Sequence, residues 1–152
     1  MYELYGSTVG IVGMGRIGRE VARRLAGWQA ELIYYDPVRL PADVERELQV
    51  RYAELDQLLR TADAVTVHVP LNVHTRNLID SESLSVMKPS AILVNTARGG
   101  LVDEDALAAA LRSGQLLGAG LDVFIHEPIP VDHPLVELPN VILTPHSAGP
   151  TW

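Results

Sequence analysis

The chain alternates short runs of β-branched and aliphatic residues with longer stretches in which apolar residues recur at helical spacing. This alternation is typical of βαβ units, in which consecutive strands run parallel and a helix crosses over between them. Several runs consist almost entirely of Val, Ile, Leu and Ala, as parallel strands covered on both faces do. The sequence therefore predicts an α/β fold, a doubly wound parallel sheet of about seven strands with helices on both faces. The predicted strands are residues 8–12, 31–35, 50–52, 64–69, 91–95, 118–123 and 141–143.

Residues 17–28 show the clearest amphipathic pattern after the first predicted strand. Ile17, Val21, Ala22 and Leu25 fall on one face of a helix, at the spacing expected of a helix that packs on a sheet. We expect all four side chains to face the sheet.

Two later segments give contrasting signals. Residues 104–113 predict a helix with Asp103 as its N-cap, acidic residues in its first turn and Gly114 at its end. Residues 37–49 contain two prolines and mixed charges, so we expect an irregular connection with at most one helical turn.

The size of the chain limits its domain organisation. Its 152 residues can bury one core but are too few for two full α/β domains. Hydrophobic residues make up 47% and charged residues 20%, which is typical of a globular protein. We therefore expect residues 1–152 to form a single domain.

The charge balance and the absence of cysteine exclude several classes of partner. The formal net charge of -7 argues against a surface that binds nucleic acid or anionic lipid. Without cysteine there is no disulfide, thiolate metal site or thiol nucleophile, and no metal site is predicted. No segment reaches the roughly 18 apolar residues of a membrane span. We expect a soluble, cytoplasmic protein.

A glycine motif, GMGRIG at residues 13–18, follows the first predicted strand directly. Gly13 permits a tight turn, Gly15 lets the backbone approach a pyrophosphate, and Gly18 lets the following helix pack closely on the strand. The N–H groups at the start of that helix would then face the anion. The spacing alone is common, but its place between a strand and a helix predicts a Rossmann-type dinucleotide site.

An acidic residue at the end of the second predicted strand supports this interpretation. Asp36 lies 18 residues beyond Gly18, where a carboxylate can accept both hydroxyls of a ribose. Its charge would repel a 2'-phosphate, which favours NAD over NADP, although Arg39 could soften that preference. The Asp-Pro pair would also fit an ordinary turn.

Three further segments follow in order: VNTARGGLVDE at residues 94–104, GAGLDVF at residues 118–124 followed by Glu127-Pro128, and TPHSAG at residues 144–149. With the glycine motif they span almost the whole chain, and their order and spacing resemble the D-isomer-specific 2-hydroxyacid dehydrogenases. That family includes glyoxylate and hydroxypyruvate reductases, D-lactate and phosphoglycerate dehydrogenases, and formate dehydrogenase. The resemblance implies an NAD-dependent oxidoreductase that transfers a hydride between nicotinamide and a 2-hydroxy or 2-keto acid.

The resemblance also implies individual roles. Arg98 matches the substrate-binding arginine, His146 the general acid/base, and Glu127 the acid paired with that histidine. Asp122 matches the contact to the nicotinamide carboxamide. The implied cofactor-binding residues are Gly13, Gly15, Arg16, Ile17, Gly18, Asp36, Pro70, Thr75, Thr96, Ala97 and Asp122.

The chemistry of the three catalytic candidates agrees with these roles. Arg98, Glu127 and His146 each follow a predicted strand at its carboxyl end, where doubly wound sheets bind ligands. A guanidinium matches a carboxylate or polarised carbonyl, and histidine, with an ordinary pKa near 6.5, exchanges protons near neutrality. A neighbouring carboxylate would orient the imidazole and favour its protonated form. We expect His126 and His133, in a proline-rich loop, to be solvated.

The length of the chain departs from the family pattern. Members of the resembled family carry a second domain that closes over the nicotinamide, and we expect this substrate domain to be absent from the chain. Hydride transfer needs a substrate held in near-attack geometry and shielded from water. We therefore expect the chain alone to bind NAD but to turn over little keto acid, and to self-associate as a homodimer through its cofactor domain.

Two other readings stay open on sequence grounds. One is a non-enzymatic NAD-sensing module, since relatives of the resembled family include transcriptional corepressors. The other is a different Rossmann enzyme, such as a methyltransferase that uses S-adenosylmethionine or a short-chain dehydrogenase. The short-chain class needs a Tyr-x-x-x-Lys pair, and none of the five tyrosines has lysine four positions later.

Overall fold

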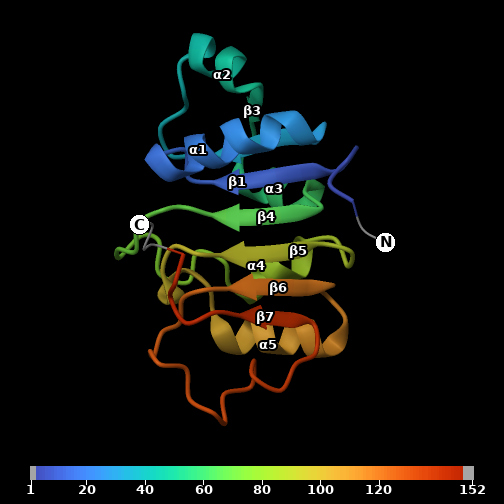
Figure 1. Cartoon of the computed structure of the whole chain (residues 1–152), viewed down its shortest axis with the longest axis vertical. Coiled ribbons are helices and arrows are strands. Elements are labelled where there is room, and N and C mark those ends of the chain that lie inside the picture. The colour runs from blue at the N-terminus through green and yellow to red at the C-terminus, as the bar shows by residue number, and fades with distance from the viewer. Residues whose placement is uncertain (1–2, 149–152) are drawn as a thin grey trace.

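A single seven-stranded sheet forms the centre of the molecule (Figure 1). The computed structural model describes residues 3–148. All strands pair in parallel, in the order β3-β2-β1-β4-β5-β6-β7, which confirms the predicted doubly wound architecture. The strands are β1 (Thr8–Val12), β2 (Glu31–Tyr35), β3 (Val50–Tyr52), β4 (Ala64–Val67), β5 (Ile92–Asn95), β6 (Gly118–Leu121) and β7 (Val141–Leu143).

Within residues 3–148, five α-helices and two short 3-10 helices connect the strands. They are α1 (Arg16–Leu25), η1 (Ala26–Trp28), α2 (Ala42–Leu48), α3 (Leu55–Thr61), α4 (Ser81–Val86), η2 (Gly99–Leu101) and α5 (Glu104–Ser113). The bounds of α5 confirm the prediction. The Asp103 carboxylate accepts a hydrogen bond from the Ala106 N–H at 3.0 Å, and Gly114 ends the helix with a φ of +76°.

The expectation of an irregular connection over residues 37–49 was wrong. Helix α2 occupies seven of these residues, and Pro41 stands at its N-cap rather than inside it. Proline is tolerated there because the first N–H groups of a helix have no partner within the helix. The two prolines therefore lie before the helix and do not interrupt it.

The two faces of the sheet are covered differently. Helices α3, α4 and α5 pack on one face and share a core with Val65, Leu93 and Leu121. Helices α1 and α2 cover the other face over β1, β2 and β3. Over β5 to β7 that second face is only partly covered within residues 3–148, and Ile142 there is 73% exposed.

One predicted core residue of α1 is exposed. Ala22 is buried, and Val21 and Leu25 pack against the core, but Ile17 is 62% exposed. The first turn of α1 touches the end of β1 through Gly18, which leaves Ile17 directed away from the sheet. The amphipathic pattern therefore fails at the position closest to the glycine motif.

The strand order creates a crevice at one edge of the sheet. The chain leaves β1 toward β2 and β3 on one side, and returns to β4 on the other side of β1. Connections on the two sides diverge at the carboxyl ends of β1 and β4, which is where open α/β sheets bind ligands.

Within the described part of the chain, no helix is long and apolar enough to cross a membrane.

We predict that Gly18→Ala destabilises the fold by about 2 to 3 kcal/mol, because its Cβ would overpack the glycine turn. An added Cβ would lie 2.0 Å from the Gly13 carbonyl oxygen. Gly15→Ala is the matched control, since its Cβ would meet nothing within 4 Å, and it should cost less than about 1 kcal/mol. Urea unfolding measures both, and equal midpoints for the two variants would contradict this packing.

Candidate active site

The turn between β1 and α1 packs tightly at Gly13 and is open at Gly15, where an added Cβ would meet nothing within 4 Å. Gly13 has a φ of +99°, and an added Cβ would lie 2.8 Å from the His68 carbonyl carbon and 2.9 Å from the Val69 nitrogen. Gly15 and Arg16, at the start of α1, are exposed. The helix has neither a side-chain N-cap nor an acidic residue in its first turn, so its N–H groups are open to an anion. The open backbone at Gly15 and the uncapped start of α1 fit the pyrophosphate of a dinucleotide.

Asp36 lies beside this turn, at the end of β2. One carboxylate oxygen accepts a hydrogen bond from the Met14 N–H at 2.8 Å, and the other accepts from the Val38 N–H at 2.9 Å. Each carboxylate oxygen has a second lone pair, so ribose hydroxyls can still bind there. Asp36 therefore both fixes the glycine turn and presents a negative charge next to it.

A crevice of about 640 Å³ opens where the strand order reverses. It brings together five residues that the sequence analysis selected from distant motifs. They are Ile17, Pro70, Thr96, Ala97 and Arg98. The exposure of Ile17 is thus explained by a position on the wall of this crevice rather than in the core.

Thr75 has a different position from these five. Its hydroxyl donates to the Pro70 carbonyl oxygen at 2.6 Å and accepts from the Asn72 N–H at 2.8 Å. These contacts close the loop that follows β4. Its predicted contact with the cofactor stays a prediction.

Sequence reasoning missed His68, which lines the same crevice. Its Nε2 lies 2.9 Å from the Thr66 hydroxyl oxygen, and burial lowers the pKa of its imidazole. Its place directly after β4, at the reversal of the strand order, was the signal that could have found it.

Arg98, Glu127 and His146 line one smaller pocket of about 320 Å³, together with Arg76. They come from the loops after β5, β6 and β7, and Arg98 also lines the larger crevice. Asn95, buried at the end of β5, shapes the loop of Arg98: its amide donates to the Arg98 carbonyl oxygen and accepts from the Ala97 N–H. The three candidates are therefore adjacent to the crevice and to each other.

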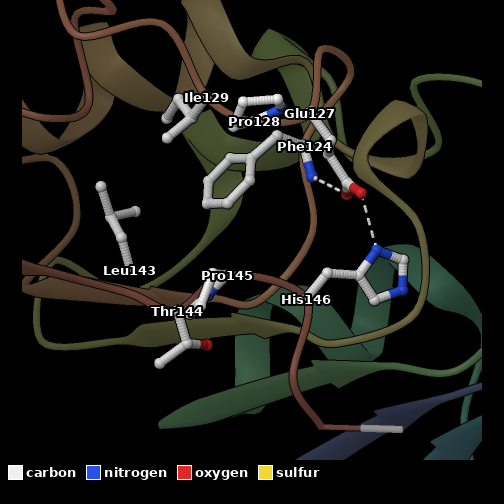
Figure 2. Close-up of a pocket in the computed structure, with 8 residues that line it drawn as sticks. All are labelled: Phe124, Glu127, Pro128, Ile129, Leu143, Thr144, Pro145 and His146. Carbon is white, nitrogen blue, oxygen red and sulfur yellow. Dashed lines mark hydrogen bonds and ion pairs between the residues drawn. The ribbon is translucent and has the colours of Figure 1, made fainter.

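Glu127 and His146 form a close pair (Figure 2). Glu127 Oε2 lies 2.7 Å from His146 Nδ1, and Oε1 accepts the Phe124 N–H at 2.9 Å. The hydrogen bond with His146, supported by that from Phe124, lowers the pKa of Glu127. With Glu127 ionised, Nδ1 must carry a proton, so Nε2 is the nitrogen that can exchange a proton with a ligand.

The loop that carries His146 is anchored by Asp122, which is only 3% exposed. The carboxylate accepts hydrogen bonds from the Thr144 hydroxyl, from the Ser147 N–H at 2.9 Å and from the Ala148 N–H at 2.8 Å. Burial alone would raise the pKa of Asp122, but these donors outweigh it and the pKa lies below its ordinary value. His146 lies in the chain between the anchored residues Thr144 and Ser147, and its backbone adopts a left-handed φ of +53°.

These contacts give Asp122 a clear structural role. Its predicted contact with the nicotinamide carboxamide stays a prediction. Gly149, the last residue of the TPHSAG motif, lies outside the described residues.

A second buried carboxylate supports the loop of Glu127. Glu104, at the start of α5, accepts the Ile125 N–H at 2.7 Å, and its other oxygen lies 3.2 Å from His133 Nε2. The expectation that His133 is solvated was wrong, since its side chain is only 15% exposed. His126 is exposed, as expected. Sequence reasoning assigned Glu104 only to the first turn of a helix, where acidic residues are common.

Backbone packing holds the same loop from another side. An added Cβ at Gly99 would lie 2.0 Å from the Phe124 carbonyl carbon and 2.4 Å from the Ile125 nitrogen. The loops of Arg98 and Glu127 thus touch through their main chains.

Within residues 3–148, no group of three His, Cys, Asp or Glu side chains is placed to hold a metal ion.

We predict that Asp122→Asn destabilises the chain by about 2 kcal/mol or more at pH 6, because the amide nitrogen cannot accept the backbone N–H groups that the carboxylate accepts. Urea unfolding measures this loss, and hydrogen exchange should show faster exchange at the Ser147 and Ala148 amides. Asp132→Asn, at an exposed position, is the control and should change neither.

The wild type and Asp122→Asn can also be compared as a function of pH. The pKa of Asp122 is lower in the folded chain than in the unfolded chain, so its stabilisation is complete above the ordinary pKa of about 3.9. It is lost as the pH falls through the folded value. The stability difference between wild type and Asp122→Asn should therefore shrink below about pH 4. A difference that is constant from pH 6 to pH 3, or absent throughout, would contradict the anchoring role.

Comparisons with known proteins agree with this geometry. Residues 1–148 match the family model of the D-isomer specific 2-hydroxyacid dehydrogenase, NAD binding domain. The glyoxylate reductase of Korarchaeum cryptofilum is 54% identical over 148 residues, which are 97% of this chain and 44% of that protein. The D-3-phosphoglycerate dehydrogenase of Mycobacterium leprae is 50% identical over 149 residues, 98% of this chain and 28% of that protein.

Solved structures are similar over nearly the whole chain. The apo D-mandelate dehydrogenase of Rhodotorula graminis superposes with a TM-score of 0.94 at 41% identity, over 99% of this chain and 44% of that one. The D-lactate dehydrogenase of Lactobacillus jensenii with NAD+ gives 0.91 at 40% identity, over 99% and 48%. The chain thus spans less than half the length of these relatives. It belongs to the D-isomer-specific 2-hydroxyacid dehydrogenase family, and residues 1–148 are its NAD-binding domain.

Proposed function

We propose that the chain is the cofactor-binding and acid/base half of an NAD-dependent oxidoreductase that interconverts 2-hydroxy and 2-keto acids. The observation that carries the proposal is the convergence of Arg98, Glu127 and His146 on one pocket beside the dinucleotide crevice. A permanent cation, a proton donor and a carboxylate partner are the groups that such a reaction needs in one place.

Each side chain has a distinct part in the proposed mechanism. Arg98 binds the carboxylate or polarised carbonyl of the keto acid through its planar fork. His146 gives a proton from Nε2 to the keto oxygen during reduction, and takes the hydroxyl proton during oxidation. Glu127 keeps the proton on Nδ1 and holds the ring in place. The bound nicotinamide supplies the hydride chemistry.

The cofactor in this proposal is NAD rather than NADP. The open space at Gly15 and the open N–H groups of α1 suit a pyrophosphate. The Asp36 carboxylate, placed at that turn, can accept ribose hydroxyls but would repel a 2'-phosphate.

We predict that Gly15→Ala weakens NADH binding at least about tenfold, or about 1.4 kcal/mol, because its Cβ fills the space that the pyrophosphate needs. The variant should keep its fold, as its Cβ meets no protein atom within 4 Å. Titration followed by NADH fluorescence measures the affinity. A folded Gly15→Ala variant that binds NADH as tightly as the wild type would place the cofactor elsewhere.

We also propose that residues 1–152 form one cofactor domain and need a separate substrate domain for full activity. An open Rossmann domain neither fixes a keto acid in near-attack geometry nor excludes water. The chain alone should therefore show little or no oxidation of NADH with glyoxylate or hydroxypyruvate, followed by absorbance.

A chimera tests the catalytic assignment directly. Residues 1–148 would replace the matching segment of the Korarchaeum cryptofilum glyoxylate reductase. The chimera should reduce glyoxylate, and His146→Asn should lower its kcat by about 10² to 10⁴. His126→Asn, at an exposed position, is the matched control. Full activity of the His146→Asn chimera would refute the catalytic assignment, whereas ordinary turnover by the chain alone would refute the need for a separate substrate domain.

Non-enzymatic NAD sensing is the less favoured reading, because the relatives described above are reductases and dehydrogenases. Membership of the family also sets aside a methyltransferase or a short-chain dehydrogenase. The proposed partner is a small 2-keto or 2-hydroxy acid, while the net charge of -7 argues against nucleic acid.

We also propose that the chain forms a homodimer and lies in the cytoplasm. Light scattering that shows a monomer would refute the dimer.

A further inference from the structure

The loop after β2 carries a cation, Arg39, three residues beyond the proposed ribose ligand Asp36. The Asp36 carboxylate accepts the Val38 N–H at 2.9 Å, which turns the chain directly beyond the strand. Arg39, the first cationic residue after Asp36, follows this turn. A guanidinium at such a position is suited to a 2'-phosphate, because it can donate two parallel hydrogen bonds to phosphate oxygens.

The Nε–Nη2 edge of this guanidinium is already engaged. Arg39 Nε lies 2.9 Å from Glu45 Oε1, and Nη2 lies 3.1 Å from Glu45 Oε2, so the pair is bidentate. The guanidinium carbon also lies 5.4 Å from the centre of the Tyr52 ring, which is cation–π distance. Glu45 and Tyr52 thus hold Arg39 from two elements, α2 and β3.

Glu45 itself is fixed from the core. Its side chain is 13% exposed, whereas that of Arg39 is 64% exposed. The Tyr34 hydroxyl, on fully buried Tyr34 of β2, donates to Glu45 Oε1 at 2.7 Å and accepts the Leu40 N–H at 2.9 Å. The Tyr34 ring also packs edge-on against Tyr52 at 5.5 Å.

The charge states of this network persist at neutral pH. Burial, with the Glu45 hydrogen bond, raises the pKa of Tyr34 to about 12, so its hydroxyl keeps the proton that it donates. Hydrogen bonds from Arg39 and Tyr34 lower the pKa of Glu45, which stays ionised. Glu45 therefore stays a charged carboxylate that Tyr34 holds in place, and it in turn holds the Arg39 guanidinium.

We propose that Glu45 is a specificity-determining residue that withholds Arg39 from a 2'-phosphate, so that the domain discriminates against NADP by more than the repulsion from Asp36. This inference rests on the proposed cofactor site. A 2'-phosphate and Glu45 would compete for the Nε–Nη2 edge of the guanidinium, and the negative charge of Glu45 would also repel a phosphate at Nη1. NAD, which has no 2'-phosphate, gains nothing from a released Arg39 and is indifferent to the pair.

Binding titrations of NADH and NADPH to the chain test this proposal. Glu45→Ala should tighten NADPH binding about tenfold and change NADH binding less than about twofold. Glu45→Gln, which keeps the shape and an acceptor for Tyr34 but loses the charge, should shift NADPH binding in the same direction. It also serves if Glu45→Ala fails to fold, which circular dichroism would reveal.

Two controls separate the released arginine from a general change in charge. Glu47, at an exposed position of α2, pairs with Arg23 of α1 and not with Arg39. Glu47→Ala therefore removes the same charge without releasing Arg39, and should leave NADPH affinity unchanged. In an Arg39→Ala background, Glu45→Ala should give no gain for NADPH, since no guanidinium is left to release.

Three results would overturn the inference. They are an unchanged NADPH affinity in both folded Glu45 variants, an equal gain in Glu47→Ala, or a gain that survives in the Arg39→Ala background. If the wild type bound neither NADH nor NADPH, the proposed cofactor site would be refuted, and this inference with it. The failures of the two proposals are therefore distinguishable.

Discussion

The site depends on the parallel direction of all seven strands. Parallel pairing places every carboxyl end at the same edge of the sheet, so loops far apart in the sequence meet there. The glycine turn follows β1, Arg98 follows β5, Glu127 follows β6 and His146 follows β7. Reversal of the strand order between β1 and β4 then opens the crevice beside which these side chains gather. A single antiparallel strand among β5, β6 and β7 would remove one of the three catalytic candidates from this edge.

The sheet brings the loops together, and buried carboxylates fix their shapes. Only the first N–H group after β6 and after β7, of Asp122 and Thr144, still bonds to a neighbouring strand. The N–H groups farther along these loops need other acceptors, because unpaired buried groups are costly. Asp122 accepts two such groups from the histidine loop, and Glu104 accepts one from the loop of Glu127. Asp36 does the same for the glycine turn. Each carboxylate joins segments that are distant in the sequence, so the charged groups around the site serve both geometry and electrostatics.

Local signals in the sequence were sufficient for most of the fold. The strands, helix α5 with its Asp103 cap, and the glycine motif depend on residues that are neighbours in the chain. The errors concern contacts between segments. Nothing near His133 in the sequence indicates that its imidazole pairs with Glu104 of α5, and nothing near Ile17 indicates that its side chain lines the crevice. The catalytic candidates were found because they follow strands within motifs, but the pairing of Arg39 with Glu45 across an intervening turn was visible only in three dimensions.

The most direct test of this account is a crystal structure of the chain with NADH bound. We expect the pyrophosphate against the N–H groups of Arg16 and Ile17, the ribose hydroxyls on Asp36, and the nicotinamide ring between Arg98 and His146. Nicotinamide bound away from these two side chains, or a pyrophosphate that does not reach the glycine turn, would contradict it.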